Sequence, residues 1–581
     1  MIKKLGKCIG EYKKPSILSP IFISLEVLME VFIPLLMASL INNGIEKNNF
    51  AYVVKIGILL LFAAIISLVF GALSGKYAAE ASAGFAKNLR QKMFYNVQTY
   101  AFSNIDKFSA SSIVTRLTTD VTNLQNAYQM IIRTVVRSPF MLIASLIFSF
   151  IISPKMTGIF LCIIPILGVG LYFIISHAHP IFKWIFSAYD VLTRIVQENI
   201  RGIRVVKSFV REEHEKEKFN DMSEKIYKKF SLAEKILAFN SPLMQFSVYS
   251  CIILISYVGA KIIVSSKGSA LGVGDISALM SYAMQILMSL MMFSMVLVMV
   301  TMAKASAERI EEIIDEEAAI SNPKSPVMNV KNGDISFENV NFSYKNNNNY
   351  CLKNINLSIK SGETVGIIGG TGSSKSTLVQ LIPRLYDVSE GSVKVGDIDV
   401  RKYDIEVLRE AVSMVLQKNV LFSGTIKENL RWGDPNATDE DIERVCRLSQ
   451  ADEFIQKFPD KYDTYIEQGG ANVSGGQKQR LCIARALIKK PKILILDDST
   501  SAVDTRTDAL IREAFKTEIP DTTKIIIAQR ISSVENSDKI IVLDGGEINA
   551  IGTHDELLKN NEIYKEVYYS QLKGGDEDAR N

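Results

Sequence analysis

"ETVGIIGGTGSSKSTLVQLI", residues 363–382, decides how the second half of the chain folds. An apolar run rich in β-branched residues leads into a glycine-rich turn, and a lysine–serine pair then opens a second apolar run typical of a helix. In such a strand–turn–helix unit, backbone N–H groups of the turn surround polyphosphate oxygens, the lysine neutralises the outer phosphates and the hydroxyl ligates Mg²⁺. Gly369, Gly372, Lys375 and Ser376 have the spacing that this chemistry requires.

Composition changes along the chain of 581 residues, which is long enough for two or three domains. Residues 1 to about 310 carry long apolar runs, whereas the remainder is typical of a soluble α/β protein. The net charge of +4 is small for this length and gives no reason to expect nucleic-acid binding. The six cysteines have no CxxC or metal-type spacing, so they indicate incidental thiols and not a disulfide framework.

The first half contains six apolar runs long enough to cross a membrane as helices, for which about 20 residues suffice. The preceding stretch, "MIKKLGKCIGEYKK", is basic and no small-residue cleavage site follows it. It therefore predicts an amphipathic segment on the cytoplasmic membrane surface and not a signal peptide. The predicted spans are 16–41, 53–76, 135–153, 155–177, 243–265 and 274–303.

Lysine and arginine placement predicts the orientation of these spans. The connection between the fourth and fifth spans holds twelve such residues, whereas the connection between the first and second has only Lys47. Both termini and the two connections of about 60 residues are therefore expected in the cytoplasm. The expected location is the cell (inner, cytoplasmic) membrane, with several passes through the lipid bilayer.

Two features of the spans have alternative interpretations. Glu26 and Glu30 lie four residues apart on one helix face, where carboxylates are costly unless they meet water or a partner. They predict either a cavity lining that attracts cationic or amphipathic solutes, or hydrogen bonding between helices. The methionine-rich stretch "MSLMMFSMVLVMVTM", 288–302, predicts either an adaptable binding wall or ordinary packing.

A second apolar strand, "ILILDD" at 493–498, lies downstream of the glycine-rich turn. An aspartate at the end of such a strand commonly holds the magnesium ion of a bound nucleotide, so Asp497 is the expected metal residue. Together the two segments predict a P-loop nucleotide site with ATP and Mg²⁺ as ligands.

The motif "NVSGGQKQR", 472–480, resembles the signature sequence Leu-Ser-Gly-Gly-Gln of ATP-binding-cassette (ABC) transporters. With six spans ahead of one cassette, the whole chain resembles an ABC exporter half-transporter. The resemblance implies an all-α six-helix transmembrane domain followed by an α/β P-loop nucleotide-binding domain, the type IV fold. It also implies that two cassettes dimerise head to tail, with each ATP between one P-loop and the partner's signature. The implied organisation is a transmembrane domain 1–315, a linker 316–333, a nucleotide-binding domain 334–573 and a polar tail 574–581.

Further motifs match the family in chain order. Tyr344, in "FSY", matches the aromatic residue that stacks on adenine. Gln417 matches the glutamine that contacts Mg²⁺ and senses the γ-phosphate, and "SAVD", 501–504, resembles the loop that contacts the second cassette. The two cytoplasmic connections resemble the family's coupling segments, with short coupling helices expected near 120–125 and 212–219.

Three departures from the family pattern fall in the pocket that this chain builds from its own P-loop side. Asp498 replaces the catalytic glutamate that polarises the attacking water, Gln529 replaces the switch histidine, and Ser374 replaces the third P-loop glycine. Aspartate is one carbon shorter than glutamate, and a displacement of about 1 Å can lower a rate by on the order of 100-fold. The pattern predicts a site that binds ATP and hydrolyses it slowly or not at all.

The signature departs from the family only at Val473, which replaces leucine. Because a signature serves the partner's pocket, the resemblance implies a heterodimer with a non-identical half-transporter that carries the consensus glutamate and histidine. The implied activity is ATP-driven export of amphipathic or hydrophobic compounds (drugs, lipids or peptides) by alternating access. The alternatives are a homodimeric exporter with two slow, equivalent sites, and an ATP-gated channel or regulatory membrane protein.

The candidate residues fall into three groups. The catalytic candidates are Asp498 and Gln529. The metal candidates are Ser376, Gln417 and Asp497. The nucleotide-binding candidates are Tyr344, Gly369, Gly370, Thr371, Gly372, Ser373, Ser374, Lys375, Ser376, Thr377, Gln417, Ser474, Gly475, Gly476 and Gln477.

Overall fold

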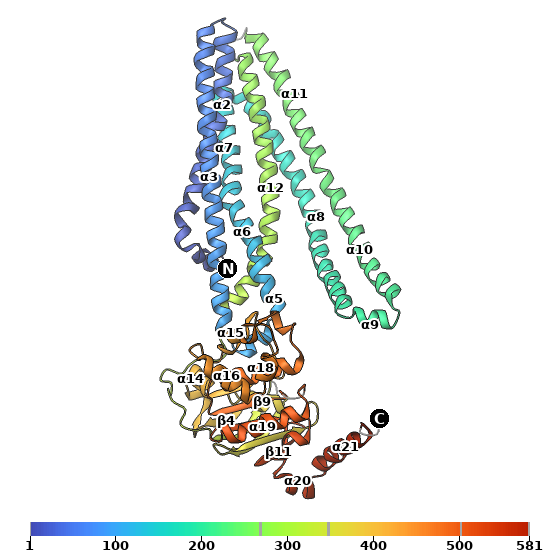
Figure 1. The fold of residues 1–581 in the computed structure, drawn as a ribbon. Coiled ribbons are helices and arrows are strands. Elements are labelled where there is room, and N and C mark those ends of the chain that lie inside the picture. Colours follow the sequence, from blue (N-terminus) through green and yellow to red (C-terminus); the bar gives the residue numbers. More distant parts are fainter. Residues whose placement is uncertain (1, 267–269, 345–348, 500–501, 579–581) are drawn as a thin grey trace. The chain divides into compact units, whose positions relative to one another are not determined.

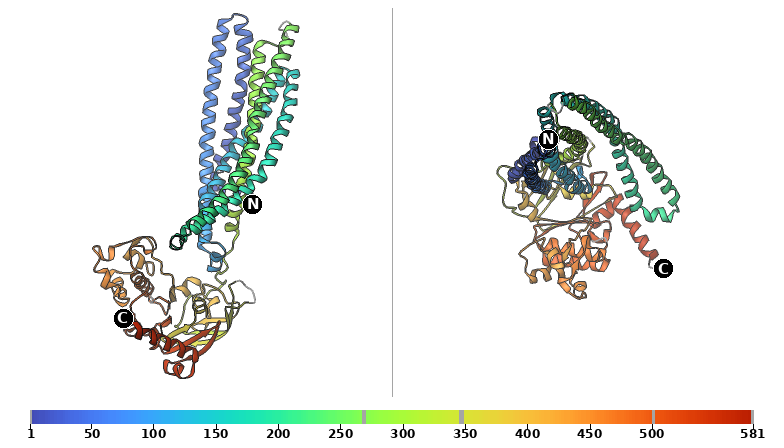
Figure 2. Two further views of the ribbon diagram at one scale, coloured as in Figure 1. Left: turned by 90° about the vertical axis from the view of Figure 1, so that its right-hand side faces the viewer. Right: turned by 90° about the horizontal axis from the view of Figure 1, so that it is seen from above.

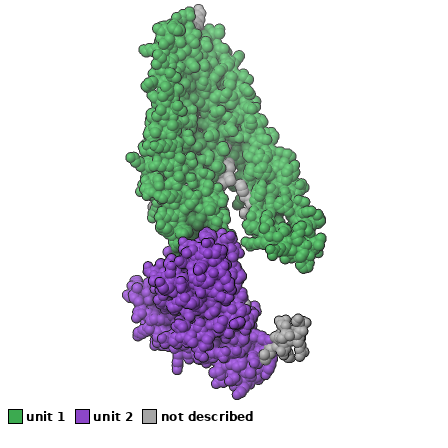
Figure 3. Space-filling model, in the orientation of Figure 1, with its two compact units in different colours: residues 1–98, 110–316 green, residues 99–109, 317–581 purple. Residues whose placement is uncertain are grey.

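The structure is a computed structural model in which the chain forms two compact units (Figures 1 and 3). The described residues of the first unit form helices, and the second unit combines helices with three sheets. Unit 1 comprises residues 1–98 and 110–316, and unit 2 comprises residues 99–109 and 317–581. The structure describes residues 2–266, 270–344, 349–499 and 502–578.

The described part of unit 1 contains six helical stretches that are long and apolar enough to cross a membrane. This number confirms the prediction from sequence, and each predicted span lies on a different stretch. Prolines within these helices are tolerated because neighbouring helices can satisfy the freed backbone groups. The six stretches are Lys4–Ile45, Phe50–Gln98, Ala110–Ile152, Pro154–Arg201, Glu212–Ser266 and Val273–Phe293.

Short 3₁₀ and π segments (labelled η) interrupt the long helices of unit 1. The helices are α1 (Ile2–Gly6), η1 (Lys7–Tyr12), α2 (Lys13–Leu40), η2 (Ile41–Ile45), α3 (Phe50–Gln98), α5 (Ala110–Thr115), η3 (Arg116–Asp120), α6 (Val121–Met130), η4 (Ile131–Val135), α7 (Val136–Ile152), α8 (Pro154–Arg201), α9 (Ile203–Ser208), α10 (Glu212–Ala238), α11 (Asn240–Ser266) and α12 (Val273–Asp315).

Within unit 1, α2, α7 and α12 pack around a buried apolar cluster that includes Val27, Val31, Met141 and Tyr282. The Tyr282 hydroxyl donates to the backbone carbonyl of Val31 at 2.8 Å. A second arrangement is the pair α8 and α10, which run side by side and are joined by the short α9 (Figures 1 and 2). The apolar faces of this pair meet in their own small cluster.

The two carboxylates of the first span are both paired with one arginine of α7. Arg137 donates to Glu26 at 2.6 Å and to Glu30 at 2.7 Å. The interpretation as interhelical hydrogen bonding is therefore the one that the structure supports. One carboxylate oxygen of Glu26 is buried without a hydrogen-bond partner among the described residues. A single guanidinium thus serves two carboxyl groups.

Unit 2 is built on a six-stranded sheet in the order β12-β11-β3-β10-β9-β6, in which only the edge pair β11–β12 is antiparallel. An antiparallel sheet in the order β2-β1-β4-β5 and a small pair β7–β8 complete the strands. The strands are β1 (Ile335–Phe342), β2 (Leu352–Ile359), β3 (Thr364–Gly369), β4 (Glu390–Val395), β5 (Ile398–Asp399), β6 (Val412–Val415), β7 (Gly424–Thr425), β8 (Tyr465–Ile466), β9 (Ile493–Asp497), β10 (Thr523–Ile527), β11 (Lys539–Asp544) and β12 (Glu547–Gly552).

Two apolar clusters hold unit 2 together. One includes residues of the four-stranded sheet, the large sheet and α13, and the other includes α16, α18, α19 and the large sheet. The central strands are buried on both faces, which explains why β9 and β10 are continuous apolar runs. The helices of unit 2 are α4 (Phe102–Lys107), α13 (Lys375–Gln380), η5 (Val400–Lys402), α14 (Ile405–Ala411), α15 (Ile426–Leu430), α16 (Asp439–Leu448), α17 (Asp452–Ile455), η6 (Lys461–Asp463), η7 (Gln468–Gly470), α18 (Gly475–Leu487), α19 (Thr505–Glu518), η8 (Ile531–Ser533), α20 (His554–Asn560) and α21 (Glu562–Asp578).

The predicted positions of the two short coupling helices are wrong. Residues 120–125 lie at the junction of η3 and α6, where Asp120 is buried and accepts hydrogen bonds from Arg309 of α12. Residues 212–219 form the first two turns of the long α10. The separate short helices of the two connections are α4 and α9, which lie upstream of the predicted positions.

Candidate nucleotide site

The site residues lie at the carboxyl ends of four adjacent parallel strands. The P-loop follows β3, Gln529 follows β10, Asp497 ends β9 and Gln417 follows β6. Ligands of open α/β sheets bind at this edge, because the loops that leave parallel strands converge there. Gln417 is exposed. The sheet order therefore gathers motifs that are more than 150 residues apart in the sequence.

The P-loop backbone is fixed by close contacts. A side chain at Gly369 would meet the Leu543 carbonyl oxygen at 2.2 Å, whereas the space beside Gly370 and Gly372 is open. Lys375 turns into the loop, and its Nζ donates to the carbonyl oxygens of Gly369 and Gly370 at 2.8 Å each. Burial lowers the pKa of Lys375, and the nearby carboxylates partly oppose this. The loop thus holds a positive charge at its centre.

Ser374, which stands in place of the third glycine, adopts a left-handed backbone conformation with φ of 68°. Glycine reaches this region without steric cost, but a serine side chain is strained there. The serine therefore adopts a backbone conformation that glycine would adopt without strain, and α13 begins directly after it. The neighbouring Ser373 is buried, and its hydroxyl donates to the Gly370 carbonyl oxygen at 2.8 Å.

The metal candidates on the P-loop and on β9 contact each other. The Ser376 hydroxyl donates to an Asp497 carboxylate oxygen at 2.8 Å. Burial raises the pKa of Asp497, and the hydrogen bond from Ser376 opposes the increase. A hydroxyl beside a carboxylate supplies the hard oxygen ligands that Mg²⁺ prefers, with the remaining positions left to water and phosphate. The donor set thus fits the expected ion.

The two predicted catalytic residues, Asp498 and Gln529, are also hydrogen-bonded to each other. Gln529 Nε2 donates to a carboxylate oxygen of Asp498 at 2.8 Å. Asp498 has a left-handed φ of 48°, and its backbone N–H donates to the Ile527 carbonyl oxygen at 3.1 Å. The Gln529 carbonyl oxygen accepts a hydrogen bond from Gln571 of α21. Gln529 and Asp498 therefore form a hydrogen-bonded pair, and their positions are set by the ends of β10 and β9.

Tyr344 follows the end of β1 and is 45% exposed. Its hydroxyl lies 2.9 Å from the hydroxyl of Thr377 in α13. Its ring meets the ring of Phe342 at 4.9 Å and that of Tyr386 at 5.1 Å, both edge to face. A half-exposed ring beside the P-loop helix is suited to stacking on a base. The predicted aromatic residue thus lies where the P-loop begins its helix.

The signature residues lie at the N-terminus of α18. Ser474 caps this helix: its hydroxyl accepts from the Gln477 backbone N–H at 3.3 Å, and the Gln477 side chain accepts from the Ser474 N–H at 2.9 Å. Gln479 accepts a hydrogen bond from the Ala502 N–H at 3.0 Å, which ties the helix to the "SAVD" loop. Ser501 of that loop lies outside the described residues. The cap leaves an exposed serine and two glycines at a helix N-terminus, which is suited to a phosphate.

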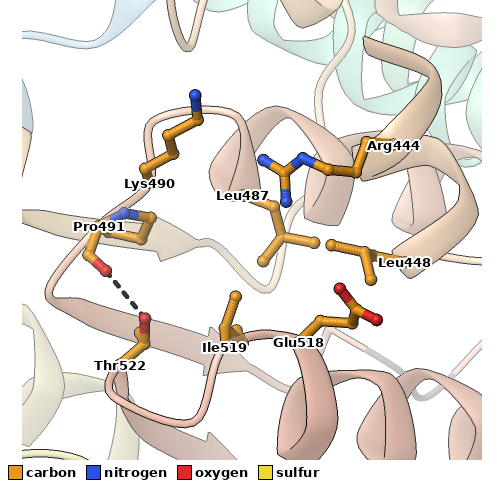
Figure 4. A pocket seen from close by; sticks show the side chains of 8 residues that line it. All are labelled: Arg444, Leu448, Leu487, Lys490, Pro491, Glu518, Ile519 and Thr522. Atoms are coloured by element: carbon orange, nitrogen blue, oxygen red, sulfur yellow. Dashed lines mark hydrogen bonds between the residues drawn. The ribbon is translucent and has the colours of Figure 1, made fainter. Parts of the chain in front are cut away.

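A pocket of about 370 Å³ lies elsewhere in unit 2, and none of the nucleotide-site candidates lines it (Figure 4). Its walls come from α16, α18, α19 and the segments that follow α18 and α19. Figure 4 shows charged side chains of Arg444, Lys490 and Glu518 around apolar ones. Lys490 is already paired with Asp441 at 3.2 Å. The pocket is therefore separate from the chemistry of the P-loop.

Sequence reasoning found the candidate residues but missed two side chains that contact them. Arg137 pairs with both carboxylates of the first span. Tyr386 contacts the Tyr344 ring and also donates to Asp106 at 2.7 Å. The "RLYD" stretch at 384–387 and the lone arginine of the third span are visible in the sequence, but no local pattern indicates their partners.

Two family models match the chain, "ABC transporter transmembrane region" over residues 16–290 and "ABC transporter" over residues 352–501. The uncharacterized ABC transporter ATP-binding protein YfiB of Bacillus subtilis is 37% identical over 571 residues, covering 98% of this chain and 99% of that protein. The uncharacterized ABC transporter ATP-binding protein Rv1273c of Mycobacterium tuberculosis is 34% identical over 549 residues, with 94% of each chain covered. ABC transporter B family member 1 of Dictyostelium discoideum is 32% identical over 85% of this chain and 54% of its own length. These matches agree with the structure, whose described residues include six membrane-type helices, a P-loop and a signature helix. The protein belongs to the ABC transporter family, as a half-transporter of the exporter type.

Proposed function

We propose that this chain is one subunit of a heterodimeric ATP-driven exporter in the cell membrane, with both termini in the cytoplasm. Its own P-loop pocket binds ATP and Mg²⁺ but hydrolyses slowly, and its signature completes the catalytic pocket of a non-identical partner. ATP closes the two cassettes, closure opens the cavity outward, and hydrolysis at the partner's site resets the complex.

The observation that carries this proposal is the hydrogen bond between Gln529 and Asp498. A general base must have a free lone pair within hydrogen-bond reach of its water. Here the carboxylate is one carbon shorter than the consensus glutamate and accepts from a neutral amide that cannot become an imidazolium. Asp498 therefore positions the attacking water less well than glutamate would, and Gln529 assists hydrolysis less than histidine would.

ATP binding depends on different groups, and these are intact. Lys375, the backbone of the P-loop and the ring of Tyr344 supply charge, N–H donors and a stacking face. Ser376 and Asp497 would hold Mg²⁺, with Gln417 at the neighbouring strand end, and the ion would neutralise phosphate charge when bound. The departures at Ser374, Asp498 and Gln529 leave these contacts in place.

Exposed apolar surface supports a requirement for a second chain. In unit 1, Phe209 and Val210, just beyond α9, are 74% and 80% exposed. In unit 2, the rings of Phe422 and Trp432 stack at 4.1 Å and are both exposed. Apolar surface of this kind on a water-facing part of a protein marks an interaction site. We assign both surfaces to the partner half-transporter.

The proposed cargo is an amphipathic or hydrophobic compound such as a drug, lipid or peptide. Met288, Met291, Met292 and Met295 of α12 are all at least 40% exposed within the single chain. Flexible, polarisable side chains adapt to ligands of different shape. These residues therefore form half of the proposed cavity wall, and the partner contributes the other half.

The decisive experiment compares this chain purified alone with the chain co-expressed with a candidate partner half-transporter. We expect weak ATPase activity alone, a large increase in the complex, and ATP-dependent dye or lipid flux in proteoliposomes. A fast rate that no partner changes would establish the homodimer instead. ATP-dependent ion current in patched membranes without dye flux would establish the channel.

A further inference from the structure

The short helix α4 is anchored on the cassette as part of unit 2. Asn104 makes two of the anchoring bonds: its side-chain amide donates to the Glu317 carbonyl oxygen at 2.9 Å, and its side-chain oxygen accepts from the Ala319 N–H at 2.9 Å. The Phe102 ring packs against the core between the two sheets. Residues 99–109 join α3 to α5, so α4 is directly connected along the chain to two membrane-type helices.

Tyr386 is the cassette residue that contacts α4 in two ways. Its hydroxyl donates to a carboxylate oxygen of Asp106 at 2.7 Å, and its ring meets the Phe102 ring edge to face at 6.0 Å. Tyr386 is 9% exposed, and burial raises the pKa of its phenol, with the Asp106 carboxylate adding to the increase. The phenol therefore remains a hydrogen-bond donor at physiological pH.

The same ring contacts the proposed adenine-stacking residue. The rings of Tyr344 and Tyr386 are 5.1 Å apart at an angle of 89°, and the buried Phe342 ring touches both. Tyr344 is also linked to Thr377, one residue beyond the proposed magnesium ligand. An edge-to-face pair is directional. A rotation of the Tyr344 ring toward a base would therefore change its contact with Tyr386.

We propose that Tyr386 is a positioning residue that couples adenine binding at Tyr344 to the placement of α4, through its ring contacts and its hydrogen bond to Asp106. This inference rests on the proposed role of Tyr344 as the adenine-stacking residue. Coupling of this type is reciprocal: the base orders α4, and an anchored α4 increases affinity for the base. A contact chain alone does not demonstrate coupling, so the test measures the response of α4 itself.

The test is hydrogen–deuterium exchange of residues 99–109 in the full transporter, reconstituted in lipid nanodiscs. Mg-ATP is compared with magnesium tripolyphosphate, which carries the phosphates and no base. We expect ATP to slow exchange in this segment by about fivefold or more, the lower range of measured couplings, and tripolyphosphate to have little effect. Equal protection by the two ligands would overturn the inference, because the base would then be irrelevant.

Tyr386→Phe keeps the ring and removes only the hydroxyl, so the variant should fold and bind ATP. We expect it to lose most of the ATP-dependent protection of residues 99–109. The matched control is Tyr350→Phe, which removes a hydroxyl that donates to Glu390 at 3.1 Å elsewhere on the cassette and should leave the protection unchanged. Unchanged protection in Tyr386→Phe would overturn the inference.

Asp106→Ala removes the acceptor of the same bond and gives an independent readout. The double variant should lose no more protection than either single variant, since both remove one interaction. Fully additive losses would contradict a shared link. If the wild-type cassette did not bind ATP, the proposed function would be refuted. If it bound ATP but residues 99–109 were not protected, only the coupling would be refuted.

Discussion

Two regions of the cassette, the P-loop side and the signature, differ in how closely they follow the family pattern, and on our proposal they serve opposite ATP pockets. The P-loop side departs at Ser374, Asp498 and Gln529, whereas the signature differs only at Val473. In the structure, the signature serine caps its helix and lies at the surface. The catalytic position instead holds a carboxylate engaged by an amide. The proposed function explains this contrast: the P-loop side needs only to bind ATP, whereas the signature must support hydrolysis in the partner's pocket.

The largest expected effect concerns Ser474. Ser474→Ala removes a hydroxyl proposed to stabilise the γ-phosphate in the partner's pocket, so ATPase activity of the complex should fall by on the order of 100-fold. Asp498→Asn should change it by less than about twofold, because the pocket of this chain contributes little turnover on this proposal. Steady-state phosphate release measures both. A loss in Asp498→Asn equal to that in Ser474→Ala would reverse the comparison.

Ser474 is also a helix cap, so its removal could weaken α18 by about 1 kcal/mol. Thr438→Ala is the matched control, because Thr438 caps α16 by accepting from the Asp441 N–H at 3.2 Å. This control loses the same kind of cap outside the signature. It should retain ATPase activity, which would assign the Ser474 effect to the nucleotide.

A smaller effect is expected from restoring the consensus pair. The double variant Asp498→Glu, Gln529→His has a longer base, and an imidazole replaces the side-chain amide that donates to the carboxylate. Hydrolysis at this chain's own pocket should rise by about 10- to 100-fold, measured as single-turnover release with the partner's P-loop lysine replaced. Gln529→His alone keeps the short carboxylate and should give a smaller gain. No increase in the double variant would remove the basis for the asymmetry.

The smallest effect is expected at Ser374. Its left-handed φ of 68° is strained for serine, so Ser374→Gly should stabilise the cassette by about 1 kcal/mol or less, since glycine also gains entropy in the unfolded chain. Thermal unfolding of the complex measures this, and ATP affinity should remain unchanged. A large fall in ATP affinity would mean that the serine hydroxyl itself binds nucleotide.

The sequence predicts much of the nucleotide site because its motifs are short and contiguous. Lys375 and Ser376 come six and seven residues after the glycine that ends β3, so local geometry alone places them near phosphate. The hydrogen bond between Gln529 and Asp498 spans 31 residues, yet the two strands that carry them are adjacent and parallel. Parallel neighbours end at the same edge of the sheet, so the two residues that follow β9 and β10 come into contact.

Other features could not be predicted for physical reasons. Arg137 lies 111 and 107 residues from its two carboxylate partners, and helix periodicity does not indicate which helices adjoin. The family resemblance predicts a coupling helix at residues 212–219, but these residues are the acidic first turns of a long helix, where negative charge is favoured by the helix dipole. The short helices α4 and α9 have six residues each, too few for a periodic signal.

The pairing of Glu26 and Glu30 with Arg137 has a consequence for biogenesis. The carboxylates leave the ribosome more than 100 residues before the guanidinium that neutralises them. The first helical hairpin is therefore made before the partner of its two carboxyl groups, and a charged side chain near the helix centre costs about 2.5–3.5 kcal/mol. Stable integration of this hairpin then depends on the arrival of the third helix, so early translational arrest or loss of Arg137 should expose it to quality-control proteolysis.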